Sequence, residues 1–287
     1  MLNGRIRTAF FAVLLTFGIS SVGLSIANKV NFDSEYYSHI PALYLTFCAI
    51  LVYERSKIFP ESRFSPYPGA LIIGSSAVIF AFIKSGIIAL SPNDLCSALA
   101  FSLLIYTAGA FLFCFGPAAF RKAAFPLSLL ILSIPIPDFL LAPISVVMRA
   151  ESAAAASIIL GFFNIFPVRD GFFLRLPEIT VEVAEQCSGM RSSIAILIIS
   201  VLYGRYCLKT YIARAALIAL AVPALPVKNG VRIAALMALS AYWKKEVLSG
   251  PLHTSGGLVF FGIALLWLIV VLYALIKIEK AALGRTH

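Results

Sequence analysis

The feature that most constrains this chain is a series of long apolar segments that recurs from its beginning to its end. Residues 8–27 and 254–276, for example, contain no charged side chain. About 20 apolar residues in an α-helix cross a bilayer, where only helices and closed barrels satisfy every backbone polar group. The whole chain is 61% hydrophobic with a mean hydropathy of +0.96, far above a soluble domain. The sequence therefore excludes a water-soluble globule and predicts an all-α polytopic membrane protein.

The apolar segments predict about eight transmembrane helices, in one integral membrane domain that covers residues 1–287. The expected spans are residues 8–27, 36–53, 69–90, 95–116, a fifth beginning at 125, 188–206, a seventh beginning at 212, and 254–276. Two further apolar pieces, 145–166 and 229–243, fit either a span or a re-entrant helix. An interfacial or re-entrant helix is expected at 145–166, because its apolar part is short. Residues 229–243 also fit the outer continuation of a kinked seventh helix.

The basic residues predict the orientation of the chain, because cytoplasmic loops carry an excess of Lys and Arg. Eight crossings place both termini on the same side of the membrane as most of the basic residues. Both termini are therefore expected in the cytoplasm. These loops also explain the net charge of +10, so binding to nucleic acid is not expected. Some basic residues fall on the outer face instead, which indicates that part of this group serves a function there: Lys228, Arg232, Lys244 and Lys245.

Cys187 lies where a polar, alternating segment meets a long apolar one. Before it, Ile179, Val181 and Val183 alternate with polar residues, which predicts a strand that forms a small hairpin with residues 171–176. Such backbone requires water or protein around it, so the hairpin is expected outside the hydrocarbon. The chain has 5 cysteines, and the others lie within apolar segments. Cys187 is therefore the cysteine best placed to act as a nucleophile at a membrane boundary.

A cysteine in the first turn of a helix lies at the positive end of the helix dipole, which favours its thiolate. Ser188 is a favourable residue at a helix start, and Arg191 shares a helical face with Cys187. The alternative interpretation is that Cys187 is an inert small hydrophobic residue and Arg191 an interface anchor. The sequence has no C-x-x-C pair and no His/Cys ligand cluster, so neither a metal nor another cofactor is expected.

Three more residues could complete a site with Cys187 on the outer face. His253, in a short loop before the last span, could act as base and acid near neutral pH. Arg232 lies within an apolar helix, where an ionisable residue is expensive and usually functional, and His39 is expected on the same face. Thiolate attack, proton transfer by histidine and a cation at the oxyanion form an acyl-transfer site. The alternative roles are a solvated His253, an Arg232 that forms a salt bridge or anchors the helix at the membrane surface, and a helix-capping His39.

Several motifs occur in a fixed order along the chain. They are Glu-Tyr-Tyr-Ser-His at 35–39, Ile-Pro-Ile-Pro-Asp-Phe at 134–139, Val-Ala-Glu-Gln-Cys-Ser-Gly-Met-Arg at 183–191, Asn-Gly-Val-Arg at 229–232, and His253 before the final span. Together they resemble the exosortase/archaeosortase family of polytopic cysteine transpeptidases, over nearly the whole chain. The resemblance implies that Cys187 is the nucleophile, His253 the general acid/base, and Arg232 the stabiliser of the thiolate or oxyanion. It also implies auxiliary or substrate-binding roles for His39, Glu185, Ser188, Arg191 and Asn229.

The family resemblance implies an enzyme of the prokaryotic cytoplasmic (inner) membrane with its active site on the extracytoplasmic face. The histidine at position 253 favours the bacterial exosortase branch. The protein partners would be secreted proteins with a C-terminal sorting signal, composed of a short motif such as Pro-Glu-Pro, a hydrophobic helix and a basic tail. Cleavage would form a thioester on Cys187, and the acceptor stays open between a lipid, an amine and an exopolysaccharide. Ile40 and the pair Ser192-Ser193 depart from the family pattern and leave the recognised motif and the subclass open.

The substrate's hydrophobic helix would lie in the membrane lipid among the last three spans, and its extended motif could pair with the hairpin by strand addition. Two other functions stay open. Broken segments at 135–137 and 223–226 are typical of carriers, which would tolerate the loss of Cys187. A purely hydrolytic intramembrane cysteine protease would use the same nucleophile with water as the acceptor. Serine and metallo versions are disfavoured, because the sequence has neither a G-x-S-x-G nor an H-E-x-x-H motif.

Overall fold

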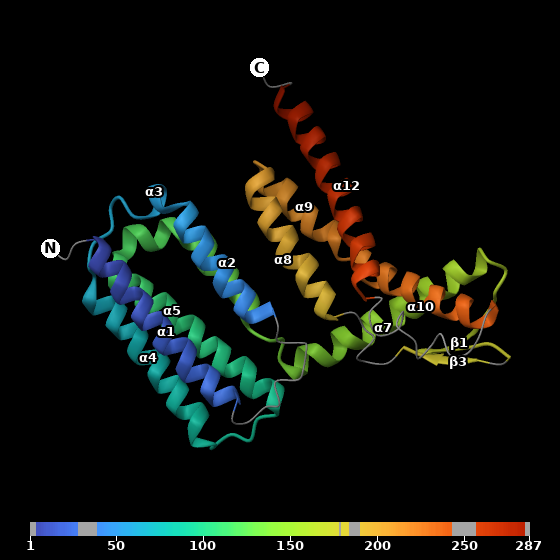
Figure 1. Ribbon diagram of the computed structural model, residues 1–287, viewed down its shortest axis with the longest axis horizontal. Coiled ribbons are helices and arrows are strands. Elements are labelled where there is room, and N and C mark those ends of the chain that lie inside the picture. Colours follow the sequence, from blue (N-terminus) through green and yellow to red (C-terminus); the bar gives the residue numbers. More distant parts are fainter. Residues whose placement is uncertain (1–3, 28–38, 178, 184–189, 243–256, 285–287) are drawn as a thin grey trace. The chain divides into compact units, whose positions relative to one another are not determined.

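The computed structural model describes residues 4–27, 39–177, 179–183, 190–242 and 257–284. Within these residues the chain forms helices and one small antiparallel sheet (Figure 1), which confirms the predicted all-α polytopic fold. The chain divides into two compact units, Met1–Leu141 and Ala142–His287, and each is described by itself. The single domain expected from the sequence stays a prediction.

The N-terminal unit is built around the long helix α5. Its elements are α1 (Gly4–Ala27), α2 (His39–Tyr53), α3 (Arg55–Ile58), α4 (Pro66–Ser85), α5 (Pro92–Lys122), α6 (Ala124–Leu129) and the 3-10 helix η2 (Leu130–Ser133). Both α1 and α4 pack along α5, whereas α2 packs against α6 and η2. Gly69 of α4 permits close packing, because a β-carbon there would lie 2.4 Å from the Cα atom of Phe113 in α5. Small residues of this kind let membrane helices approach backbone to backbone.

The helix α5 is interrupted at Gly116 and Pro117. Gly116 has a φ of +78°, which glycine adopts without steric cost. Pro117 has no N–H to donate to the carbonyl of Phe113, one turn earlier. That carbonyl instead accepts a hydrogen bond of 3.1 Å from the backbone N–H of Ser65. The loop before α4 therefore satisfies a polar group that the break in the helix exposes.

The C-terminal unit combines α7 with the sheet and the later helices. Its elements are α7 (Asp138–Gly161), β1 (Val168–Asp170), β2 (Phe173–Arg175), β3 (Thr180–Glu182), α8 (Met190–Cys207), α9 (Tyr211–Ala221), α10 (Ala224–Tyr242) and α12 (Gly257–Gly284). The strands are antiparallel in the order β1-β2-β3, with Leu174 opposite Val181. Pro223 lies between α9 and α10. Pro226 falls in the first turn of α10, where its missing N–H removes no helical hydrogen bond.

Two apolar cores hold the C-terminal unit together. The first joins α8, α9 and α12 and includes Ile196 and Leu268. The second joins α7, the sheet and α10 and includes Leu174 and Met237, both of which are fully buried. Figure 1 shows the sheet and α10 beside the C-terminal half of α7. The second core therefore fixes the sheet and α10 to one common helix.

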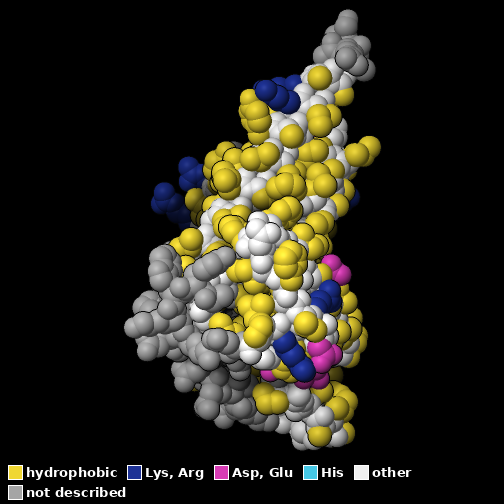
Figure 2. Space-filling model, turned by 90° about the vertical axis from the view of Figure 1, so that its right-hand side faces the viewer, with side chains coloured by type: hydrophobic (Ala, Val, Ile, Leu, Met, Phe, Trp, Pro, Cys, Tyr) yellow, Lys and Arg dark blue, Asp and Glu magenta, His cyan; other side chains and the backbone are white. Residues whose placement is uncertain are grey.

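Six helical segments of the described chain are long and apolar enough to cross a membrane: α1, α4, α5, α7, α9 with α10, and α12. Three of the expected spans correspond to shorter apolar helices, His39–Tyr53, Ala124–Ser133 and Ser192–Cys207. Large hydrophobic side chains are exposed on these helices, for example Leu266 and Val270 of α12, and Figure 2 shows such side chains over most of the visible face. A chain with this surface is a multi-pass membrane protein.

The structure also bears on the two apolar pieces for which a span and a re-entrant helix were both open. A short interfacial or re-entrant helix was expected at 145–166, but residues 145–161 belong to α7, which has 24 residues and begins at Asp138. The backbone N–H of Asp138 donates to a carboxylate oxygen of Asp94 at 2.8 Å, so the helix starts earlier than its apolar pattern indicates. Residues 229–242 belong to α10, which corresponds to the kinked continuation of the seventh expected helix. The predicted hairpin is present as β2 and β3, and β1 adds a strand that the sequence did not predict.

Candidate active site

The structure describes part of the predicted site. Arg232 and Asn229 lie in α10, and His39 begins α2 in the N-terminal unit. Arg191 lies in the first turn of α8, but its side chain is not among the described atoms. Four predicted residues fall outside the described ranges: Cys187, His253, Glu185 and Ser188. The site is therefore built from the segments that flank residues 184–189, which are β3 on one side and α8 on the other.

Asn229 fastens α10 to α7. Its side chain is 1% exposed, and its Nδ2 donates to the Oγ of Ser152 at 3.1 Å. The Ser152 hydroxyl in turn donates to the backbone carbonyl of Met148 at 2.6 Å. A buried amide or hydroxyl left without such a partner would destabilise the fold by about 1–3 kcal/mol. This chain of hydrogen bonds therefore explains why a polar pair is retained between two apolar helices.

Gly230 lies at the same crossing and sets how closely the two helices approach. A β-carbon at Gly230 would lie 2.5 Å from the Cβ of Ala155 and 3.0 Å from the backbone nitrogen of Ala156. Both distances are shorter than ordinary van der Waals contact. The Asn-Gly pair of the 229–232 motif thus has a structural role, because it holds α10 against α7 at a fixed distance.

Lys228 connects α10 to the start of α8. Its side chain is only 6% exposed, and its ammonium donates a hydrogen bond to the Oγ of Ser192. A buried ammonium group is costly unless it is hydrogen-bonded. Arg232 follows four residues later, so it lies one turn further along the same face of α10. Lys228 therefore ties α10 to the helix that follows Cys187.

Arg149 of α7 holds the end of β3. Its Nε donates to the backbone carbonyl of Val183 at 2.6 Å, and its Nη2 lies 3.3 Å from a carboxylate oxygen of Glu182. The guanidinium also stacks over the ring of Phe172, 4.0 Å from its centre. Val183 is 1% exposed, and its N–H donates to the carbonyl of Phe172 at 2.9 Å. The last described residue before 184–189 is thus held on both sides of its peptide unit.

These contacts converge on the segment that carries Cys187. The chain enters it at Val183, held by α7, and leaves it near Ser192, held by α10, while Asn229 locks α7 to α10. Lys228 of α10 brings a positive charge to Ser192 in α8, the helix that follows Cys187. A nearby cation favours a thiolate over a thiol. Among the residues that the structure describes, no group of His, Cys, Asp and Glu could hold a metal ion.

Sequence reasoning did not assign a role to Arg149, Ser152 or Lys228. The signal for Lys228 was present, since it is a basic residue on the unexpected side of the predicted topology. The signal for Arg149 was its position as a charged residue in an otherwise apolar stretch. Ser152 gave no signal, because one serine among alanines is unremarkable until α10 is placed beside it.

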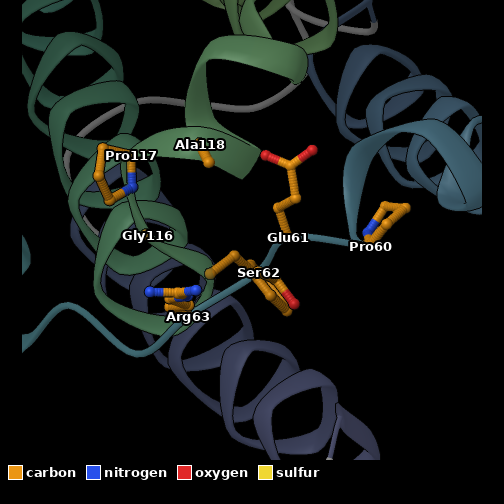
Figure 3. Close-up of a pocket in the computed structure, with 8 residues that line it drawn as sticks. Pro60, Glu61, Ser62, Arg63, Gly116, Pro117 and Ala118 are labelled. Atoms are coloured by element: carbon orange, nitrogen blue, oxygen red, sulfur yellow. The ribbon is translucent and has the colours of Figure 1, made fainter.

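A cavity of about 380 Å³ lies in the N-terminal unit and is lined by residues 60–63 and 115–118. Figure 3 shows Glu61 and Arg63 of the loop on one side and Pro117 of α5 on the other. The ammonium of Lys122 donates to Glu61 at 2.8 Å and holds the pKa of that carboxyl below its usual value. None of the described residues of the predicted site lines this cavity. It is therefore a feature of the broken helix and not of the candidate active site.

Comparison with known families gives one match. The family described as transmembrane exosortase (Exosortase_EpsH) matches residues 30–270 of the chain. The matched range begins before His39 and ends beyond His253, so it contains every residue predicted for the site. No curated protein and no solved structure shows a significant match to the chain.

Proposed function

Because the chain belongs to the transmembrane exosortase family, we propose that it is a membrane cysteine transpeptidase that removes the C-terminal sorting signal of secreted proteins. The family supports a membrane protease or transpeptidase kind of function. The observation that carries the finer proposal is the bond from Lys228 to Ser192. It connects α10, which carries the Asn229–Arg232 motif, to the helix that follows Cys187, and this supports the proposal that the two motifs form one site.

The proposed reaction is acyl transfer in two steps. The thiolate of Cys187 attacks the carbonyl carbon of the scissile peptide bond, and the oxygen becomes an oxyanion that Arg232 stabilises. His253 donates a proton to the leaving nitrogen, the carbon–nitrogen bond breaks, and a thioester remains on Cys187. An acceptor nucleophile then attacks the thioester carbon and loses its proton to His253, the carbon–sulfur bond breaks, and the Cys187 thiolate is restored. A lipid, an amine or an exopolysaccharide could serve as this acceptor.

The open edge of β3 supports strand addition as the mode of substrate recognition. Ile179 and Val183 use their N–H groups to bond the β2 side. In an antiparallel ladder the intervening residues, Thr180 and Glu182, therefore direct their N–H and C=O groups to the opposite side. Among the described residues, no strand pairs there, because β3 ends the order β1-β2-β3. An extended substrate motif that pairs with this edge would be led toward Cys187, while the substrate's hydrophobic helix lies in the lipid.

We further propose that the enzyme resides in a prokaryotic cytoplasmic membrane, with the site on the extracytoplasmic face and both termini in the cytoplasm. The basic loops support this orientation. Reporter fusions at each terminus that fluoresce only in the cytoplasm test it. A dark reporter at either end, with the fusion intact in the membrane, would contradict the orientation without affecting the proposed chemistry.

The test of the proposed function is Cys187→Ala in the full-length chain, expressed together with a secreted reporter that ends in motif, apolar helix and basic tail. We expect the wild type to remove the signal and Cys187→Ala to leave the reporter at full mass. Cys207→Ala is the matched control, because Cys207 is a free, exposed cysteine at the end of α8, and it should process normally. Processing by Cys187→Ala would contradict the proposal and favour a carrier or another nucleophile. The mass of the new reporter C-terminus then separates water from any other acceptor.

A further inference from the structure

Arg149 is the described residue that acts most directly on the entrance to the Cys187 segment. Its side chain is 16% exposed, although arginine is usually among the most exposed residues. Three contacts hold its guanidinium: the Val183 carbonyl at 2.6 Å, the Phe172 ring at 4.0 Å and the Glu182 carboxylate at 3.3 Å. The planar group is therefore fixed in both position and orientation.

The bond to Val183 replaces a rung of the sheet. The N–H of Val183 bonds the carbonyl of Phe172, and in a regular antiparallel ladder the Val183 carbonyl would accept from the same opposite residue. Here that carbonyl accepts from the Nε of Arg149. A hydrogen bond from a charged donor is shorter and stronger than one between neutral groups. Arg149 thus holds the last carbonyl of the β2–β3 ladder, at Val183.

We propose that Arg149 is a positioning residue of the transpeptidase: by holding the Val183 carbonyl it fixes the end of β3, four residues before Cys187. This inference rests on the proposed function. Cys187 follows Val183 by four residues, a length of chain that reaches at most about 14 Å. A shift of Val183 therefore moves the point from which this short length of chain begins. A displacement of about 1 Å at a reacting atom can lower the rate about 10²-fold.

The geometry separates this role from that of a simple charge. The Glu182 side chain is 50% exposed, so its ion pair with Arg149 contributes little. The Nε donor and the flat face on Phe172 belong to arginine and not to lysine. Arg149→Lys keeps the positive charge but loses both features. It should therefore behave like Arg149→Ala if position is what matters, and like the wild type if charge is what matters.

Arg169 provides a matched control. It is also an arginine that joins the sheet to α7, with its Nη2 donating to the Ala150 carbonyl at 3.1 Å and its Nε to the Gly171 carbonyl at 3.3 Å. It lies in β1, however, at the far edge from β3, and it is exposed. Arg169→Ala removes a similar sheet-to-helix contact without touching the strand that leads to Cys187.

The test measures kcat and KM of the full-length enzyme in membranes with the reporter substrate, and the rate at which iodoacetamide alkylates Cys187, identified by its peptide mass. We expect Arg149→Lys and Arg149→Ala to lower kcat about 10²-fold with a much smaller change in KM, and to change the alkylation rate. Arg169→Ala should stay within about twofold of the wild type. The amount of monodisperse enzyme in detergent is measured for each variant, so that kcat refers to folded protein.

The outcomes are distinguishable. Wild-type kcat in Arg149→Lys would overturn the positioning role, and so would an equal loss in Arg169→Ala. If Arg149→Ala does not fold, Arg149→Lys together with Phe172→Leu, which removes the stacking surface, decides the question by the same criterion. If Cys187→Ala still processes the reporter, the proposed function fails, whatever Arg149 does. If Cys187→Ala is inactive and both Arg149 variants are fully active, the inference about Arg149 alone fails.

Discussion

Gly230→Ala is the substitution whose effect follows most directly from the geometry. The new β-carbon would lie 2.5 Å from the Cβ of Ala155, whereas carbon atoms prefer a separation of about 3.5–4.0 Å. The helices α7 and α10 would have to move apart by about 1 Å. Overpacking of this kind destabilises by about 1–3 kcal/mol, while alanine gains about 1 kcal/mol over glycine in a helix. We expect a net loss of up to about 2 kcal/mol.

The matched control is Gly262→Ala in α12. A β-carbon at Gly262 would meet no atom within 4 Å, so only the gain in helix propensity remains. Thermal unfolding in detergent should therefore show a Tm that is lower by about 5 °C for Gly230→Ala and not lower for Gly262→Ala. Because α10 carries Arg232, the same displacement should also reduce kcat of Gly230→Ala, and it should leave Gly262→Ala near the wild type.

A second substitution tests the cause of the loss. Ala155→Gly removes the atom that lies closest to the new β-carbon, so the double variant Gly230→Ala/Ala155→Gly should recover part of the Tm and of kcat. The recovery should be incomplete, because the new β-carbon would still lie 3.0 Å from the backbone nitrogen of Ala156 and 3.1 Å from the backbone carbonyl oxygen of Ser152. A coupling energy above about 1 kcal/mol between the two sites is expected for residues in contact. Equal Tm values for Gly230→Ala and Gly262→Ala would contradict the close packing of α7 against α10. So would a double-mutant cycle that shows no coupling between positions 230 and 155.

Two further predictions concern the substrate edge and the buried lysine. Thr180→Pro removes an N–H on the open side of β3 and should raise KM about tenfold, which is the effect of one lost hydrogen bond. Thr180→Val keeps this N–H and should leave KM unchanged. Equal KM values for the two variants would contradict strand addition. Lys228→Met should lower kcat and shift the alkylation of Cys187 to higher pH, while the fold is retained because an apolar side chain can replace a buried cation. The control Lys277→Met in α12 should leave the alkylation profile unchanged, and an unchanged profile in Lys228→Met would show that its charge does not act on the thiol.

The part of the sheet that could be predicted from sequence is the part with one buried face. In β3 the inward Val181 alternates with the exposed Thr180 and Glu182, and this alternation is what period-2 patterning detects. The strand β1 has no buried face, because Val168 and Asp170 are both exposed. Its strand conformation is supplied by pairing with β2 and leaves no trace in its own sequence.

The length of α7 could not be predicted for a different reason. Arg149 and Glu151 interrupt an apolar pattern, and charges of this kind usually mark the end of a span. In the structure the Arg149 guanidinium stacks over the Phe172 ring and donates a hydrogen bond to the Val183 carbonyl. Its partners lie more than 20 positions away in the sequence, so a local pattern cannot distinguish a charge that meets solvent from one that meets a strand.

The motif at 229–232 was predicted as a unit, but its residues have different physical roles. Arg232 is the member expected to act on the reacting atoms. Asn229 bonds Ser152 of α7, and Gly230 lies against Ala155 of α7. Sequence spacing places all three residues on one helix, but it does not reveal that two of them pack against α7.

The burial of Lys228 explains why this residue departs from the rule used to predict the orientation of the chain. The positive-inside rule concerns basic residues in solvated loops near the ends of spans, and under it Lys228 lies on the wrong side. Its ammonium is buried and bonded to Ser192, so it is not a loop charge and does not weigh against cytoplasmic termini. A cation that the fold keeps despite the cost of desolvation requires another reason to be there. Its ammonium reaches Ser192 of α8, the helix that follows Cys187, and under the proposed function the need for a thiolate would supply that reason.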